Sequence, residues 1–265
     1  MTCRACGNSE LDSKIRMTLT DRYSEDKRKV NFFECMECGN FSADPILDEK
    51  YHLNRYKNNH SWGLTSNEKK YHYYSSREKK QKAINKKIVT NFIKHFDKFS
   101  TIKHLDVACA EGVLVTSVSS NTYWLTSGIE IDKNSSSWGA SRGRKIINEE
   151  FSAKLFKEGE FQLVSIHEAL DHFNSIPKVL NQINEITQKG GMISLLHTFY
   201  NFEYEEKNNK FHHSSYFTMD GIKNILTKQG YKFIKAYRMP KPGNFPRKFL
   251  NKRFISKYQI IAEKL

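Results

Sequence analysis

The sequence contains no long hydrophobic run. None of its apolar stretches approaches the roughly 20 residues that a membrane-spanning helix needs, and the N-terminal MTCRACGN lacks the hydrophobic segment of a secretory signal. We therefore expect a cytoplasmic protein without a membrane span. Hydrophobic residues still make up 38% of the 265 residues and aromatic residues 13%, which is enough for a packed core and excludes a disordered chain.

Cysteine is scarce, and four of the five cysteines form two closely spaced pairs, Cys3 with Cys6 and Cys35 with Cys38. A cytoplasmic chain rarely holds disulfides, whereas four thiolates in two C-x2-C turns are the usual ligands of a structural zinc ion. Because 28 residues separate the pairs, we expect residues 11–33 to form an extended β-hairpin. Such a site has no open coordination position for catalysis. The alternatives are that the cysteines are incidental, or that the zinc has been lost or replaced in this protein.

Acidic residues are outnumbered by basic ones, 29 against 43, which gives a formal net charge of +14. This excess predicts an anionic partner: nucleic acid, a phosphorylated or nucleotide-linked substrate, or an anionic membrane surface. The basic residues are densest at positions 77–87 and 240–257. A lysine-rich surface can also serve solvation alone, so charge does not choose between these partners.

Residues 104–132 are typical of an α/β nucleotide-binding sheet. A buried strand at 104–107 leads into a turn of small residues, a short apolar helix and a second strand at 123–131. In such sheets the turn approaches an adenosine closely, and an acidic residue at the end of the second strand binds the ribose hydroxyls. Glu130 follows Asp106 by 24 residues, near the roughly 20 expected for that acid.

Hydrophobic periodicity and turn residues predict several further elements. Apolar residues at every fourth position indicate an amphipathic helix over residues 84–96 that packs on the sheet. Pro177 fits the first turn of a helix, which Gly190-Gly191 would close. Thr218 fits the N-cap of a later helix.

The segments LDVACAEG and GIEID resemble the first two motifs of class I S-adenosylmethionine-dependent methyltransferases, usually written LD-V/I-G-C-G-x-G for the first. FQLVSIHEALDHF and KGGMISLLH resemble the family's fourth and fifth strands. The resemblance covers residues 101–265 and implies an α/β, Rossmann-like, mostly parallel sheet that ends in an antiparallel hairpin. It also implies that the donor is bound by Asp106, Ala108, Cys109, Ala110, Gly112, Glu130, Ile131 and His167.

Two glycines of the usual first motif are replaced here, by Ala108 and Ala110, and only Gly112 remains. Alanine lacks the freedom of glycine at positive φ. The turn must therefore keep an ordinary backbone conformation or carry strain. The same departure leaves open a scaffold protein whose donor site has decayed.

CRAC…CMEC, YHYYSS and HHSSYFT are similar to segments of zinc-ribbon methyltransferases, including deoxysugar C-methyltransferases and enzymes that modify surface glycans. Carried over by position, the resemblance implies a substrate site formed by Tyr71, Tyr73, Tyr74, Ser76, His212 and Tyr216. His212 replaces an acidic residue of that pattern, and the long C-terminal domain of the C-methyltransferases is absent. Both departures favour an oxygen or nitrogen acceptor over carbon.

Methyl transfer is an in-line displacement that requires the donor methyl and the nucleophile to be aligned about 3–3.5 Å apart. A hydroxyl acceptor must also lose its proton, usually to a histidine. His172, after the fourth strand, and His213, after the fifth, are the candidate bases, and a purely local hydrogen bond is the alternative for each. An acceptor that is already anionic needs only positioning and a nearby cation.

The predicted organisation is a zinc ribbon at residues 1–60, a helical linker and substrate lid at 61–100, and an S-adenosylmethionine-binding domain at 101–265. We expect methyl transfer to a sugar, a nucleotide sugar or a phosphorylated or phosphoramidate precursor of a surface (capsular) polysaccharide. The alternative is a ribosomal RNA base methyltransferase with a zinc ribbon, whose phosphate contacts would use the positive charge. Against that alternative, no Asn/Asp-Pro-Pro-aromatic segment follows the fourth strand.

Overall fold

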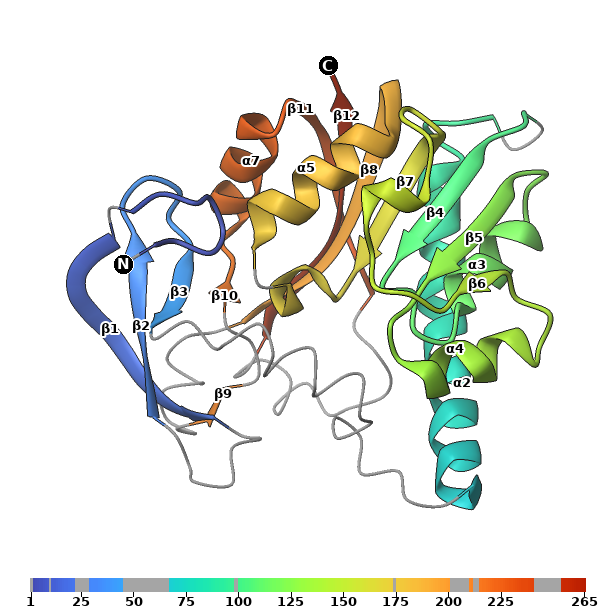
Figure 1. Cartoon of the computed structure of the whole chain (residues 1–265), viewed down its shortest axis with the longest axis horizontal. Helices are drawn as coiled ribbons and strands as arrows, with labels where there is room; N and C mark the ends of the chain where they lie inside the picture. The colour runs from blue at the N-terminus through green and yellow to red at the C-terminus, as the bar shows by residue number, and fades with distance from the viewer. Residues whose placement is uncertain are drawn as a thin grey trace.

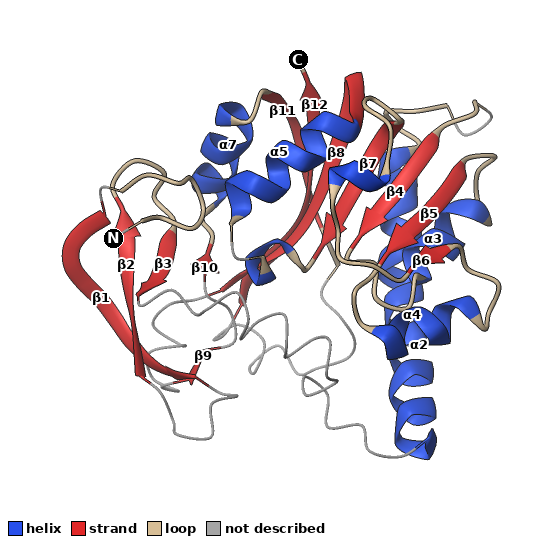
Figure 2. Cartoon of the chain, in the orientation of Figure 1, coloured by secondary structure: helices blue, strands red, loops and turns tan. Residues whose placement is uncertain are grey.

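The computed structural model describes residues 2–9, 11–21, 29–44, 67–97, 100–173, 175–200, 210–211, 215–240 and 254–265. These residues form a five-stranded sheet near the N-terminus and a seven-stranded sheet flanked by helices (Figures 1 and 2). Within these ranges, no helix combines the length and the apolar character needed to cross a membrane.

The larger sheet has the strand order β11-β12-β8-β7-β4-β5-β6. Its strands are β4 (Lys103–Val107), β5 (Leu125–Ile129), β6 (Ile146–Ile147), β7 (Phe161–His167), β8 (Thr187–Tyr200), β11 (Tyr231–Arg238) and β12 (Phe254–Lys264). The five strands that follow one another in the sheet as β8-β7-β4-β5-β6 run parallel, whereas β12 is antiparallel to both β8 and β11. The predicted mostly parallel sheet with a terminal antiparallel hairpin is confirmed.

Helices cover both faces of this sheet (Figure 2). They are α2 (Asn67–Phe92), α3 (Val113–Ser119), α4 (Lys133–Ala140), α5 (Ile176–Ile186) and α7 (Met219–Lys228). Successive strand residues point to opposite faces, so Leu163 and Leu196 join the core beneath α2 and α3. Their neighbours Val164 and Leu195 join the core beneath α5 and α7. The two cores fix the position of the strand ends between them.

Three local predictions differ from the structure, and the first is the strand expected at 123–131, which is the shorter β5. The helix expected over residues 84–96 begins at Asn67 and therefore includes the YHYYSS segment. The prediction that Gly190-Gly191 closes a helix was wrong, because α5 ends at Ile186 and both glycines lie in β8. The Thr187 backbone is extended, and its hydroxyl donates to the Ile183 carbonyl at 2.6 Å. This bond satisfies a terminal carbonyl and ends the helix earlier.

The smaller sheet has the order β10-β3-β2-β1-β9. Its strands are β1 (Leu11–Asp21), β2 (Lys29–Cys35), β3 (Phe41–Asp44), β9 (Lys210–Phe211) and β10 (Ser215–Tyr216). β1 and β2 pair antiparallel, which confirms the predicted hairpin between the cysteine pairs. Because β9 and β10 follow β8 in sequence, this sheet is not built from residues 1–60 alone.

The cysteine-containing segment is tied to the loop that follows β7. The Arg4 side chain is buried, and its Nη2 donates to the Phe173 carbonyl at 2.7 Å. The Ile176 amide donates in turn to the Arg4 carbonyl at 3.3 Å. A second tie joins Asn40 to Thr218, whose amide donates to Asn40 Oδ1 at 2.9 Å. The start of the chain therefore braces the segment that carries His172.

Candidate functional site

The turn after β4 has the conformation of a glycine-rich turn although two glycines are missing. Ala108 and Ala110 have φ of 55° and 51°, and Gly112 has φ of 66°. An L-residue in the left-handed region costs about 1–2 kcal/mol relative to its ordinary conformation. Strain of this kind persists where the surroundings impose it, often at functional sites. Of the two conformations that the sequence left open, the structure has the strained one.

Glu130, at the end of β5, holds this turn in place. Its Oε2 accepts from the Ala110 amide at 2.8 Å, and its Oε1 accepts from the Asp132 amide at 2.8 Å. The carboxylate is buried, and burial raises its pKa. Each carboxylate oxygen can accept more than one hydrogen bond, so Glu130 retains acceptor capacity for hydroxyl groups of a ligand.

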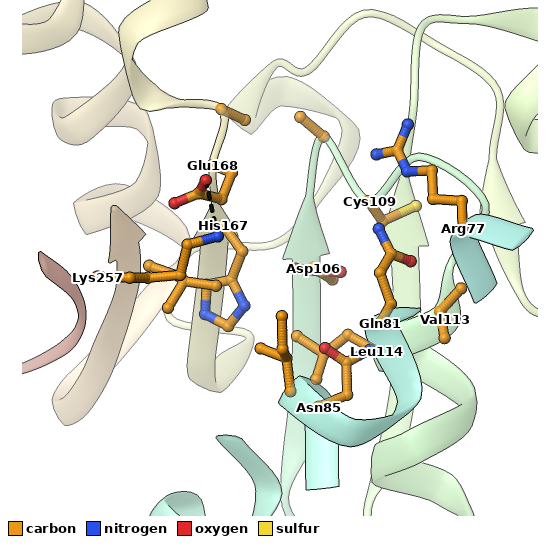
Figure 3. A pocket seen from close by; sticks show the side chains of 14 residues that line it. Arg77, Gln81, Asn85, Asp106, Cys109, Val113, Leu114, His167, Glu168 and Lys257 are labelled. Carbon is orange, nitrogen blue, oxygen red and sulfur yellow. Dashed lines mark ion pairs between the residues drawn. The ribbon is translucent and has the colours of Figure 1, made fainter. Parts of the chain in front are cut away.

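A cavity of about 170 Å³ opens at the carboxyl ends of β4 and β7, beside this turn (Figure 3). Asp106 lies at its floor, where burial raises the pKa of the carboxyl to about 7. Ala108 and Cys109 line it from the turn. His167 lines it from the end of β7, and burial lowers the pKa of this imidazole to about 3, so it is neutral near pH 7.

Helix α2 forms one wall of the cavity through Arg77, Gln81 and Asn85. The Arg77 guanidinium lies 3.4 Å from the buried Glu111 carboxylate, and its Nη1 donates to the Tyr73 hydroxyl at 3.1 Å. Burial alone would lower the pKa of Arg77, but Glu111 and Tyr73 more than offset this and raise it. This wall therefore carries a guanidinium that stays protonated and is paired with the Glu111 carboxylate.

Glu168 and Lys257 form the opposite wall (Figure 3). Glu168 also has a left-handed backbone, with φ of 54°. Its two carboxylate oxygens accept from the Thr198 hydroxyl at 3.0 and 2.8 Å, and Lys257 Nζ lies 3.0 Å from Oε2. The second wall thus presents an ammonium group whose position depends on a strained glutamate.

The residues predicted to bind the donor gather in one place. Asp106, Ala108, Cys109 and His167 line the cavity. Ala110 is bonded to Glu130 beside it. Of the remaining two, Gly112 is the N-cap of α3, and Ile131 directly follows Glu130.

The aromatic residues predicted to form the substrate site lie outside the cavity lining described above. Tyr74 is buried, with its ring 5.1 Å from that of Trp138 and its hydroxyl 3.4 Å from Ser135 Oγ. Tyr71 is 57% exposed and also contacts Trp138. Tyr73 receives the hydrogen bond from Arg77. The YHYYSS segment of α2 therefore packs against α4 through Tyr71 and Tyr74, and Tyr73 helps to hold Arg77 in the cavity wall.

The remaining predicted substrate and catalytic residues are spread over the molecule. Ser76 is exposed on α2. Tyr216 is buried in the smaller sheet, with its ring 5.3 Å from that of Phe32. His172 is half-buried in a short 3-10 helix, with Nε2 3.9 Å from Asp171 Oδ1. His212 and His213 lie outside the described residues.

Sequence reasoning missed five polar residues of the cavity: Arg77, Gln81, Asn85, Glu168 and Lys257. The first three recur every fourth residue, so they share one helical face. That polar stripe is a signal that the sequence already contained. Lys257 reaches the cavity only because β12 pairs with β8, and no local pattern predicts that pairing.

The four paired cysteines meet as predicted. Their Sγ atoms all lie within 4.8 Å of one another. Cys3 Sγ is 3.7 Å from Cys38 Sγ, and Cys6 Sγ is 3.6 Å from Cys35 Sγ. Zinc–sulfur bonds of about 2.3 Å in a tetrahedron place sulfur atoms about 3.8 Å apart. The cluster therefore has the donor atoms and the dimensions of a four-thiolate zinc site.

Comparisons with known proteins agree with this geometry. The family model described as "Methyltransferase domain" matches residues 76–236. Magnesium protoporphyrin IX methyltransferase from Synechocystis PCC 6803, solved with bound S-adenosylmethionine, superposes with a TM-score of 0.56 at 12% identity, covering 84% of this chain and all of that chain. The carbon methyltransferase of CurJ superposes with a TM-score of 0.50 at 10% identity, covering 68% of this chain and 54% of that chain.

The [4+2]-cyclase SpnF is a further neighbour, with a TM-score of 0.52, 10% identity and coverage of 68% and 80% of the two chains. A comparison with curated protein sequences finds no match. Structural likeness at these identities establishes the fold, and the cyclase illustrates that one fold supports several chemistries. The family match spans more than half of the sequence and includes the strained turn, Glu130 and most of the cavity. The chain therefore belongs to the methyltransferase-domain family and has the class I methyltransferase fold.

Proposed function

We propose that the protein transfers a methyl group from S-adenosylmethionine to an oxygen or nitrogen atom of a small-molecule acceptor. The acceptor class is a sugar, a nucleotide sugar or a phosphorylated or phosphoramidate precursor of a surface polysaccharide. The observation that carries this proposal is the cavity, which has the predicted donor turn on one side and a lysine on the other.

The donor side fits S-adenosylmethionine, which supplies a methyl group on a cationic sulfonium. The turn after β4 exposes backbone for close approach to an adenosine, and Glu130 offers carboxylate oxygens to the ribose hydroxyls. Asp106 offers a negative group on the cavity floor. The Arg77 guanidinium can pair with the carboxylate of a bound amino acid. The ribose hydroxyls, the cationic part and the carboxylate of the donor would thus each meet a complementary group of the chain.

The acceptor side favours an anion. Lys257 is half-buried at the cavity wall, and its ammonium lies 3.0 Å from Glu168 Oε2. A cation held in a partly dry site attracts an anion more strongly than it would in water. An anionic oxygen needs no base, only alignment with the methyl group. For a hydroxyl acceptor, His172 and His213 are the proposed bases.

A structural zinc ion at Cys3, Cys6, Cys35 and Cys38 belongs to the same proposal. The sulfur–sulfur distances match a tetrahedral site. The role of the ion is to hold the N-terminal segment, whose Arg4 braces the loop after β7. Elemental analysis of the purified protein should find about one zinc per chain, and cysteine-to-serine variants should lose it.

The acceptor is tested by incubating the protein with methyl-labelled S-adenosylmethionine and separate pools of phosphorylated sugars, nucleotide sugars, neutral sugars and RNA. We expect label in the phosphorylated or nucleotide-linked pool. Label in RNA alone would contradict the proposal and support the RNA alternative, and donor binding without any turnover would support a scaffold.

Lys257→Met should reduce this transfer strongly while leaving donor affinity unchanged. Lys232→Met is the matched control, because Lys232 is exposed on β11. Equal activity of the two variants would show that Lys257 does not contribute to the acceptor site.

A further inference from the structure

Four polar side chains form a continuous hydrogen-bonded chain on the sheet face beneath α2. Thr126 Oγ1 lies 2.9 Å from His104 Nδ1, and His104 Nε2 lies 2.8 Å from Ser165 Oγ. The Ser165 hydroxyl donates to Asp106 Oδ1 at 2.6 Å. His104 and Ser165 are fully buried, and Asp106 opens onto the cavity. These four hydrogen-bonded side chains therefore connect the interior of the sheet to the cavity floor.

The direction of these bonds follows from chemistry. An ionised carboxylate only accepts hydrogen bonds, so the Ser165 hydroxyl must donate to Asp106. Ser165 Oγ then accepts from His104 Nε2–H, which leaves Nδ1 without a proton and able to accept from the Thr126 hydroxyl. Burial keeps His104 neutral, since it lowers the pKa of the imidazole to about 3. All three donors point towards Asp106.

We propose that His104 and Ser165 are positioning residues that keep Asp106 ionised, so that the cavity floor can hold a cationic ligand. Linked donors polarise one another and strengthen the last bond of the chain. This inference rests on the proposed function, because the cationic ligand is the S-adenosylmethionine of that function. It adds two residues that do not touch the ligand.

Burial opposes ionisation of Asp106, and the hydrogen-bonded chain from Thr126 to Ser165, here called the relay, offsets that effect. Burial is the main cause that raises the pKa of Asp106, Glu130 adds to it, and the bond from Ser165 lowers it. Removing the last donor should therefore leave more of the carboxyl protonated at neutral pH. A protonated Asp106 would lose its attraction for a cation, which predicts weaker donor binding at low pH.

Other charged or titratable groups surround Asp106, and a change in their charge could also alter donor binding as the pH changes. His167 from β7, like His104, has a pKa lowered to about 3, and burial raises the pKa of the Cys109 thiol well above its ordinary value. Both therefore stay neutral between about pH 5.5 and 8.5. Arg77 from α2, Glu168 after β7 and Lys257 from β12 complete the charged lining of the cavity. Glu130, after β5, and Glu111, which pairs with Arg77, also have pKa values raised by burial and are competing titrants.

The test is calorimetric titration with S-adenosylmethionine from about pH 5.5 to about pH 8.5. In the unmodified protein we expect affinity to weaken as the pH falls through about 7. In Ser165→Ala the midpoint should rise by about one pH unit, which weakens binding about fivefold at neutral pH and much less at the alkaline end. A merely structural defect would weaken binding equally at every pH.

Ser194→Ala is the matched control, because Ser194 pairs with Ser165 across β7 and β8 and is equally buried. Its hydroxyl contacts His167 and Gln259, so the midpoint should stay in place. His104→Leu, in which Ser165 can still donate to Asp106, should raise the midpoint less than Ser165→Ala does, and His104→Gln, which retains an N–H donor, should raise it less again. These variants keep the test available if Ser165→Ala fails to fold.

Asp106→Asn should abolish the pH dependence, and Glu130→Gln should retain it. An unchanged midpoint in folded Ser165→Ala and His104→Leu would overturn the relay, as would loss of the pH dependence in Glu130→Gln alone. Absence of donor binding by the unmodified protein at every pH would instead reject the proposed function. The two failures are therefore distinguishable.

Discussion

Two bends at the carboxyl edge of the large sheet hold non-glycine residues in the left-handed region, but they are stabilised differently. In the bend after β4, Ala108 and Ala110 have no side-chain polar groups, and the neighbouring Glu130 holds the backbone in place. In the bend after β7, Glu168 is held by its own carboxylate, which bonds to Thr198 and Lys257. The first bend offers its backbone to a ligand, whereas the second offers a side chain.

This difference matches the two halves of the proposed reaction. A nucleoside-containing donor needs close backbone approach and a few fixed acceptors, which the first bend and Glu130 provide. A variable acceptor needs charged side chains that specify its chemistry, and Glu168 with Lys257 provides them. The comparison therefore predicts that changes in the first bend alter donor affinity, while changes in the second alter turnover.

The largest effect should come from crowding the first bend. A Cβ at Gly128 would lie 2.4 Å from Cys109 Sγ and 2.8 Å from Cys109 Cβ. Gly128→Ala should therefore lower the free energy of unfolding by about 3 kcal/mol. The double variant with Cys109→Ala should recover part of this loss in a chemical denaturation cycle, because it removes Sγ but keeps the Cβ of residue 109. Strictly additive effects would show that the turn is not packed against β5 as described.

Removing the carboxylate that holds the first bend should affect the donor next. Glu130→Ala should raise the dissociation constant for S-adenosylmethionine at least about tenfold, which corresponds to about 1.4 kcal/mol. Glu158→Ala removes an exposed carboxylate of the same type and should leave affinity unchanged. Unchanged affinity in Glu130→Ala, measured by calorimetry, would rule out the assignment of Glu130 to the ribose.

The second bend should respond to loss of its hydroxyl donor. Thr198→Val should lower the free energy of unfolding by about 1 kcal/mol, because a hydrogen bond to Glu168 is lost. A double-mutant cycle with Glu168→Ala should show coupling of similar size. Donor affinity should change little in either variant. A large loss of donor affinity would mean that the two bends do not serve separate ligands.

The smallest expected effect is an increase in the free energy of unfolding. Ala108→Gly removes the left-handed strain but adds freedom to the unfolded chain, so we expect a net stabilisation of about 0.5–1 kcal/mol. Ala83→Gly is the opposite control, because Ala83 is exposed within α2 and its replacement should cost about 1 kcal/mol. Equal destabilisation by both changes would indicate that the backbone at Ala108 is unstrained.

Much of the fold could be predicted because its signals are local. β1 and β2 form the hairpin predicted between the cysteine pairs, and the Thr218 side chain caps α7 by accepting from the Gly221 amide. Gly190-Gly191 misled the prediction because glycine is common both after helices and at irregular strand ends. There the Thr187 hydroxyl, rather than a glycine, determined where α5 ends.

Part of the cavity and its turn could be located from the sequence, and part could not. Asp106, the alanine turn and Glu130 lie within one short stretch of sequence whose spacing carries the signal. Glu168 and Lys257 meet only through the pairing of β8 with β12, a long-range contact that no local pattern specifies. The YHYYSS aromatics were assigned by resemblance, and the described contacts of Tyr74 are with Trp138 and Ser135.

A crystal structure with S-adenosylhomocysteine, the demethylated donor, tests the central claim most directly. The account predicts the adenosine between the ends of β4 and β5, with its ribose hydroxyls on Glu130 and its amino-acid end in the cavity beside Asp106 and Arg77. Electron density for the ligand elsewhere on the molecule, or an empty cleft at saturating ligand, would contradict it.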